Sequence, residues 1–203
     1  MRRAAALALL LLLGHPGALP AGDEGGQRRS AAALMDVLMW NREPVGGRFA
    51  LVDQNGRTRT DADFRGRLLL LYFGFTSCPD VCPTDLQEIA RALDLLGAEG
   101  EALQPVFITL DPDRDTTALL AEYVPNFHPR LIGLTGCSES IREAADAYKV
   151  FYERVARPDG SYTIDHSAFV YLMDRAGTYL GFFPPGTSAE RMLAIIRPHL
   201  SSR

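Results

Sequence analysis

An uninterrupted apolar stretch, residues 68–75, dictates the architecture of this chain. It reads Leu-Leu-Leu-Leu-Tyr-Phe-Gly-Phe and carries no charged side chain. Such a stretch suits a strand that is covered on both faces, and strands of this kind belong to parallel sheets with helices on either side. The stretch therefore predicts an α/β domain.

The rest of the chain alternates between strand and helix periodicity. Helical spacing of apolar residues marks segments 83–97, 115–124, 138–148 and a last one from Ser188. Pro83 suits the first helical position and Asp115 suits a helix cap. Strands are predicted over 48–52, 57–60, 106–110, 131–134, 168–173 and 178–183, and residues 149–155 extend a helix or form an edge strand. This order predicts a thioredoxin-like fold with an N-terminal β-hairpin, in which parallel strands are closed by an antiparallel hairpin.

The amino terminus carries a targeting pattern. Two arginines precede ten apolar residues, 4–13, and then several glycines and prolines, which is the order of a signal peptide. We expect residues 1–21 to be a signal peptide or, if uncleaved, an N-terminal membrane anchor. Residues 22–46 are then a tether with a short helix, and residues 47–203 form the folded domain. Either way the domain lies outside the cytoplasm, in an oxidising compartment such as the periplasm.

Charge and cysteine content exclude several classes of function. The 203 residues include 21 Lys and Arg against 25 Asp and Glu, a net charge of −4, with no basic patch that would suit nucleic acid. Three cysteines are too few for a disulfide scaffold or a four-thiolate zinc site. The chain has neither a phosphate-binding glycine loop nor a nucleophile-elbow serine. The chemistry must therefore involve two cysteines or recruit other ligands.

Cys78 and Cys82 stand where the apolar strand turns into a helix. Open α/β sheets place their sites at such carboxyl ends of strands. Because Cys82 directly precedes the predicted helix, the helix dipole and unpaired amides should favour its thiolate. Three uses of the pair remain open: a structural disulfide, thiol–disulfide exchange, and binding of a soft metal ion such as Cu(I) together with an imidazole.

His166 is the candidate imidazole among the four histidines. It precedes the predicted strand 168–173, in a loop that faces the strand-to-helix turn of a thioredoxin-like sheet. A purely structural histidine is the alternative. The third cysteine, Cys137, is expected to be a small core residue at a helix start.

At these residues the chain resembles the Sco/SenC family of copper-binding assembly proteins for cytochrome c oxidase. The matching segments extend over nearly the whole domain: Tyr72-Phe73-Gly74-Phe75-Thr76, Cys78-Pro79-Asp80-Val81-Cys82-Pro83, Ile108-Thr109-Leu110-Asp111-Pro112-Asp113-Arg114-Asp115-Thr116, Leu134-Thr135-Gly136 and Asp165-His166-Ser167. The cysteine string with a downstream Asp-His-Ser is highly specific. Two positions depart from the pattern, because Ser77 stands where many relatives have a bulkier residue and Cys137 replaces a residue that is usually not a thiol.

The resemblance implies a thioredoxin-like fold in which Cys78, Cys82 and His166 bind one copper ion, Cu(I) or Cu(II). We expect Asp80 and Asp165 to help orient these ligands. The family function implies a metallochaperone rather than an enzyme. It would assist assembly of the dinuclear copper (CuA) site of cytochrome c oxidase subunit II, or supply another cuproprotein.

A thiol reductant is a further expected partner, because an oxidised cysteine pair cannot bind copper as thiolates. The alternative is an extracytoplasmic thiol–disulfide oxidoreductase or thiol peroxidase that uses the same two cysteines.

Overall fold

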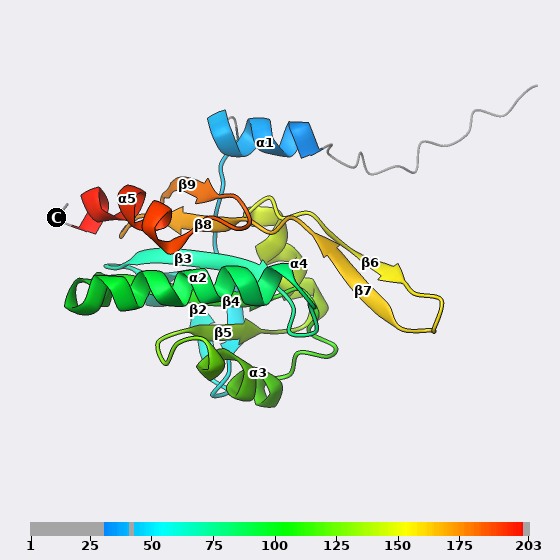
Figure 1. Cartoon of the computed structure of the whole chain (residues 1–203). Coiled ribbons are helices and arrows are strands. Elements are labelled where there is room, and N and C mark those ends of the chain that lie inside the picture. Colours follow the sequence, from blue (N-terminus) through cyan, green and yellow to red (C-terminus); the bar gives the residue numbers. More distant parts are fainter. Residues whose placement is uncertain (1–30, 41–42, 201–203) are drawn as a thin grey trace, which may run out of the picture.

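A seven-stranded sheet organises the domain (Figure 1), with the strand order β2-β1-β5-β4-β3-β8-β9. The structure, a computed structural model, describes residues 31–40 and 43–200, so the signal peptide or anchor expected over residues 1–21 lies outside the described residues. No helix within these described ranges is long and apolar enough to cross a membrane.

The centre of the sheet is parallel. Strand β3 (Leu68–Gly74) pairs with β4 (Leu103–Thr109), which pairs with β5 (Ile132–Thr135). On the other side β3 pairs antiparallel with β8 (Val170–Met173), and β8 with β9 (Tyr179–Phe183). The N-terminal hairpin of β1 (Ala50–Asp53) and β2 (Thr58–Thr60) adds to β5 antiparallel. The predicted α/β fold with a parallel centre, a closing hairpin and an N-terminal hairpin is confirmed.

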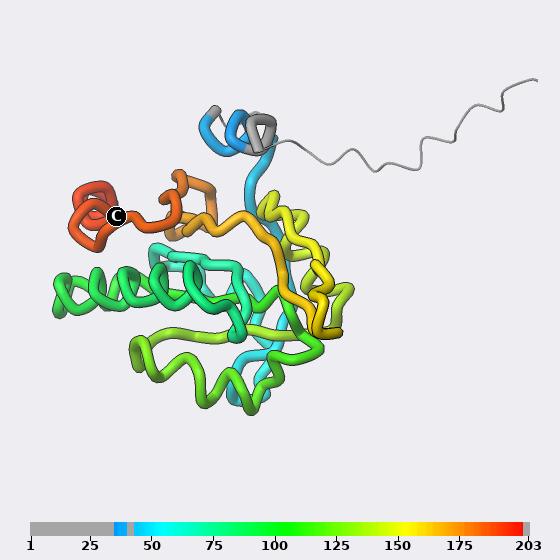
Figure 2. The backbone as a smooth tube through the Cα atoms, turned by 45° about the vertical axis from the view of Figure 1, so that its right-hand side comes forward, coloured from blue at the N-terminus to red at the C-terminus, as the bar shows by residue number. Residues whose placement is uncertain are grey.

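Both faces of β3 are covered, as its apolar composition predicts, and all seven of its residues are buried. In the described ranges, five helices and three short 3-10 turns accompany the strands: α1 (Ala31–Trp40), η1 (Asp61–Phe64), α2 (Val81–Leu96), η2 (Gly97–Ala102), α3 (Thr117–Tyr123), η3 (Val124–Asn126), α4 (Ser138–Ala147) and α5 (Ala189–Leu200). Helices α2 and α5 lie side by side (Figure 2). The ring of Phe73 on β3 contacts Tyr148 at the end of α4, while Tyr72 stacks with Phe107.

A second, separate sheet was not expected. Strands β6 (Tyr152–Ala156) and β7 (Tyr162–His166) pair with each other and with no other described strand, and they project from the domain (Figure 1). Of the two alternatives for residues 149–155, the edge strand is therefore confirmed from Tyr152 on and the helix extension is wrong, but the strand belongs to this small sheet and not to the main one. Gly160 (φ +82°) closes the hairpin, where the amide of Arg157 donates to the carbonyl of Ser161 over 2.8 Å.

Three predictions about helix starts are wrong for local reasons. Helix α2 begins at Val81, so Pro83 is its third residue. Helix α3 is capped by Thr116, whose hydroxyl accepts from the amide of Leu119 over 3.2 Å, because the carboxylate of Asp115 is buried elsewhere. Cys137 is the exposed cap of α4 rather than a core residue, since its sulfur accepts from the amide of Ser140.

Candidate metal centre

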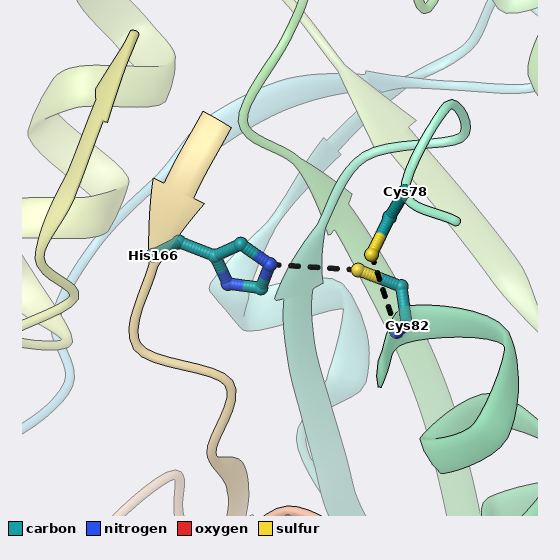
Figure 3. A group of neighbouring side chains, drawn as sticks. All are labelled: Cys78, Cys82 and His166. Atoms are coloured by element: carbon teal, nitrogen blue, oxygen red, sulfur yellow. Dashed lines mark hydrogen bonds between the residues drawn. The ribbon is translucent and has the colours of Figure 1, made fainter. Parts of the chain in front are cut away.

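The structure brings together the three side chains that the sequence singled out (Figure 3). Cys78 lies in the loop after β3, Cys82 is the second residue of α2, and His166 ends β7. The Sγ atom of Cys82 lies 3.5 Å from Nε2 of His166, and the ligand atoms of all three residues lie within 4.8 Å of one another. Among the residues described, this is the one cluster of at least three His, Cys, Asp or Glu side chains with metal-site spacing.

These separations fit one soft metal ion. Bonds of about 2.3 Å to sulfur and about 2.0 Å to nitrogen, arranged trigonally, place a sulfur and a nitrogen about 3.7 Å apart. The observed 3.5 Å between Cys82 and His166 is close to that value. Two thiolates and one imidazole are donors that suit copper, whereas zinc would take a fourth ligand.

The cysteine loop is held by hydrogen bonds from outside the helix. Asp115, fully buried beyond the end of β4, accepts the amide of Thr76 over 2.9 Å and its hydroxyl over 2.5 Å. The same carboxylate accepts the hydroxyl of Thr109 over 2.6 Å. The amide of Cys78 donates to the carbonyl of Phe75 over 3.2 Å. Because β3 and β4 are parallel, their carboxyl ends meet and these side chains share one edge of the sheet.

The acidic thiol of the pair is Cys78, and the prediction that Cys82 is the thiolate is wrong. The helix begins earlier than predicted, so the amide of Cys82 itself donates to Sγ of Cys78 over 3.4 Å. A hydrogen bond from the Cys82 thiol, together with further bonds from His166 and backbone amides, holds the pKa of Cys78 well below its usual range. The hydrogen bond to Cys78 and burial raise the pKa of Cys82. We therefore expect the metal-free pair to retain one proton, on the buried sulfur of Cys82.

The floor of the centre is tight and contains polar groups that sequence reasoning missed. A Cβ atom on Gly74 would lie 2.9 Å from Sγ of Cys82 and 3.0 Å from the ring of Tyr72, so only glycine leaves room for the sulfur. Asp85 is wholly buried one turn along α2, accepts the amide of Gly186 over 2.8 Å, and has its pKa raised by burial. The sequence could have indicated that Asp85 lies near the centre, because this carboxylate stands three residues after Cys82 and next to the apolar positions of an amphipathic helix.

His166 is held by packing more than by hydrogen bonds. Its ring meets the edge of Phe75 with 5.8 Å between ring centroids. Its Nδ1 is buried, and no hydrogen-bond partner for it occurs in the described part of the chain. Asp165 is exposed, and as the preceding residue of a strand it lies on the opposite face, so the expectation that it orients a ligand is wrong. Asp80 does contribute a backbone hydrogen bond to Cys78.

Comparison with known proteins agrees with the geometry. A family model described as SCO1/SenC matches residues 39–201. An SCO2-like protein of Rickettsia prowazekii is 46% identical over 155 residues, 75% of this chain and 76% of that protein. The mitochondrial SCO2 homolog of Bos taurus is 43% identical over 183 residues, 89% of this chain and 67% of that protein.

The structure of ScoI from Bradyrhizobium japonicum with copper bound superposes with a TM-score of 0.72 at 40% identity, covering 76% of this chain and 99% of that one. The predicted thioredoxin-like fold is confirmed.

Proposed function

The chain belongs to the SCO1/SenC family, and on that premise we propose that it carries one copper ion on Cys78, Cys82 and His166. The observation that supports this most directly is the convergence of the three ligand atoms within 4.8 Å of one another. The copper-bound ScoI structure is a further support, at 40% identity.

The proposed chemistry is capture and release of copper as cargo. Both sulfurs bind as thiolates, so loading releases the proton that the metal-free pair retains. Nε2 of His166, which faces Cys82, is the nitrogen donor. Three ligands leave the ion with low coordination, so a partner with additional ligands can take it in steps. Oxidation of the pair to a disulfide blocks loading, and a thiol reductant restores it.

The proposed client is the dinuclear copper site of cytochrome c oxidase subunit II, as the family resemblance implies. Residues 47–203 would form the copper-binding domain. Residues 1–21 would export it or hold it at the outer face of a membrane, which places the carrier in the periplasm. In this role the chain transfers an ion to its partner and does not turn over a substrate.

Anaerobic titration of the reduced protein with Cu(I), in competition with a chromogenic chelator, tests the site. We expect one ion per chain, strong weakening in Cys78→Ser and Cys82→Ser, and intermediate weakening in His166→Ala. Cys137→Ser and His128→Ala are the matched controls and should bind as the wild type does. Binding that survives loss of both loop cysteines, or that ignores His166→Ala, would refute the assignment.

A second candidate function is thiol–disulfide exchange, favoured by the half-buried, low-pKa Cys78 beside the buried Cys82. The Cys78 thiolate would attack a disulfide of the client and form a mixed disulfide, releasing one client thiolate. Cys82, as its thiolate, would then displace the second client sulfur, leaving a reduced client and a Cys78–Cys82 disulfide. This function predicts catalytic reduction of client disulfide with a dithiol reductant and little effect of His166→Ala, whereas the copper site predicts a large effect on metal binding.

A further inference from the structure

The hairpin that carries His166 is not part of the main sheet. Among the strands that the structure describes, β6 and β7 pair only with each other, with Tyr152 opposite His166. Backbone hydrogen bonds of the seven-stranded sheet therefore do not fix the height of β7 above the cysteines. The hairpin is tethered at its base, where the amide of Ser167 donates to the carbonyl of Phe151 over 3.0 Å. Its orientation over the centre must come from side-chain contacts.

Tyr162, at the start of β7, makes several of these contacts. Its hydroxyl donates to Oδ1 of the buried Asp111 over 2.8 Å, and its carbonyl accepts from Nη1 of Arg114 over 3.1 Å. Two guanidinium groups stack on its ring: Cζ of Arg114 lies 4.0 Å and Cζ of Arg154 lies 4.7 Å from the ring centroid. Arg114 is itself paired with Asp111, and Arg154 with Asp113. Such stacked, charge-assisted contacts define a single orientation of the strand.

The segment that receives Tyr162 also holds the cysteine loop. Residues 111–115 follow β4, and Asp115 accepts both the amide and the hydroxyl of Thr76, two residues before Cys78. The guanidinium of Arg114 lies 6.0 Å from the ring centroid of Phe75, and that ring packs against His166. One segment thus contacts both halves of the metal centre, which come from distant parts of the chain.

We propose that Tyr162 is a positioning residue for the third metal ligand. By clamping β7 onto residues 111–115 it keeps His166 within reach of the cysteine sulfurs before the ion arrives, and so limits the rearrangement that binding requires. This inference rests on the proposed function, because it concerns how the copper site is preorganised. When the clamp is released, the hairpin samples orientations in which only the two sulfurs meet the ion. The apparent affinity is then the intrinsic affinity multiplied by the fraction of molecules in which His166 is still in place.

The test compares two substitutions that each delete one hydroxyl donating to an aspartate. Tyr162→Phe removes only the hydroxyl bond to Asp111 and keeps the ring that both guanidinium groups contact. Ser161→Ala, the matched control, removes a 2.6 Å bond to Asp159 within the hairpin turn. We expect Tyr162→Phe to weaken Cu(I) binding roughly three- to tenfold, from the loss of one hydrogen bond, and Ser161→Ala to leave it unchanged.

Repeating the comparison in a His166→Ala background separates positioning from general stability. If Tyr162 acts through His166, Tyr162→Phe has no effect on Cu(I) affinity once the imidazole is absent. An equal loss in both backgrounds, or a loss no larger than that of Ser161→Ala, overturns the proposal.

A metal-free measurement keeps this test independent of the proposed function. Diethyl pyrocarbonate modifies accessible imidazoles, and peptide mass spectrometry gives the rate at His166. We expect several-fold faster modification in Tyr162→Phe than in the wild type and Ser161→Ala, because the ring leaves its packed position more often. Equal rates refute the clamp, whereas a wild type that fails to bind Cu(I) refutes the copper site instead.

Discussion

Replacing Gly74 by alanine should damage the metal centre through one methyl group. The added Cβ would lie 2.9 Å from Sγ of Cys82, 3.0 Å from Cε1 of Tyr72 and 3.1 Å from Cε2 of Phe107. Ordinary contacts of a Cβ atom begin near 3.4 Å, so the sulfur must retreat by about 0.5 Å, because the two rings block the other directions. Overpacking of this kind costs about 1–3 kcal/mol in the free energy of unfolding.

The displaced sulfur is a proposed ligand, so the variant should lose copper affinity as well as stability. Ligand binding stabilises the folded state by about 2.7 kcal/mol at a hundredfold excess over Kd, and a tenfold weaker Kd removes about 1.4 kcal/mol of that gain. Urea denaturation of metal-free and Cu(I)-loaded protein, each under anaerobic conditions, measures both quantities. We expect Gly74→Ala to lower the metal-free stability and also to shrink the increment that copper adds.

Gly133→Ala is the matched control. Its Cβ would lie 2.8 Å from Cγ1 of Val124, between β5 and the preceding 3-10 turn η3 and away from the cysteines. This variant should lose metal-free stability to a similar extent while the copper increment stays at the wild-type value. If both glycine variants keep the full increment, the close packing of Gly74 against Cys82 has no role in the metal centre and the reasoning is wrong.

Three further predictions address the groups around the centre. In metal-free protein, iodoacetamide should label Cys78 readily at pH 6, because its lowered pKa keeps it a thiolate where an ordinary thiol with a pKa of about 8.5 is almost wholly protonated. Comparable labelling of the Cys82 peptide would contradict the arrangement in which Cys82 keeps the proton. Asp115→Ala should lower the unfolding free energy by about 3–5 kcal/mol, because it leaves buried donors unpaired. Thr116→Ala, which removes only the helix cap, should cost about 1 kcal/mol. Equal losses in the two variants would argue against the buried network around Asp115. Since burial raises the pKa of Asp85 above its unfolded value, the contribution of this carboxyl to stability should fall as the pH rises above about 4. Asp85→Asn should therefore gain stability relative to the wild type as the pH is raised from about 4, and a constant difference in urea midpoints would refute this.

Local patterns predicted most of the architecture, because each depends on near neighbours. The apolar run of β3, the helical spacing after Pro83 and the closely spaced strands of the N-terminal hairpin are short-range signals, and the elements they mark are present. The hairpin of β6 and β7 was missed although Asp159-Gly160 is a turn signal. Its strands are short and half exposed, so they lack the apolar alternation on which strand prediction depends.

The protonation of the cysteine pair was beyond the reach of spacing alone. A shift of the helix start by two residues moved Cys82 into the helix and turned its amide toward Cys78, which reversed the expected acidity. Gly74 and Asp85 belong to the centre only because folding packs a strand against a helix beneath the sulfurs. Neither residue carries that information in its immediate neighbours.

The amino-acid sequence by itself determined the layered α/β class, the cysteine pair at the end of a buried strand, and His166 as the partner to expect. Tertiary structure decided that the imidazole reaches the sulfurs, which sulfur is acidic, and that Tyr162 and residues 111–115 hold the two halves of the centre together. The physical reason is range. Periodicity and capping act over one or two turns of chain, whereas Cys82 and His166 are 84 residues apart, and their separation depends on how every element between them packs.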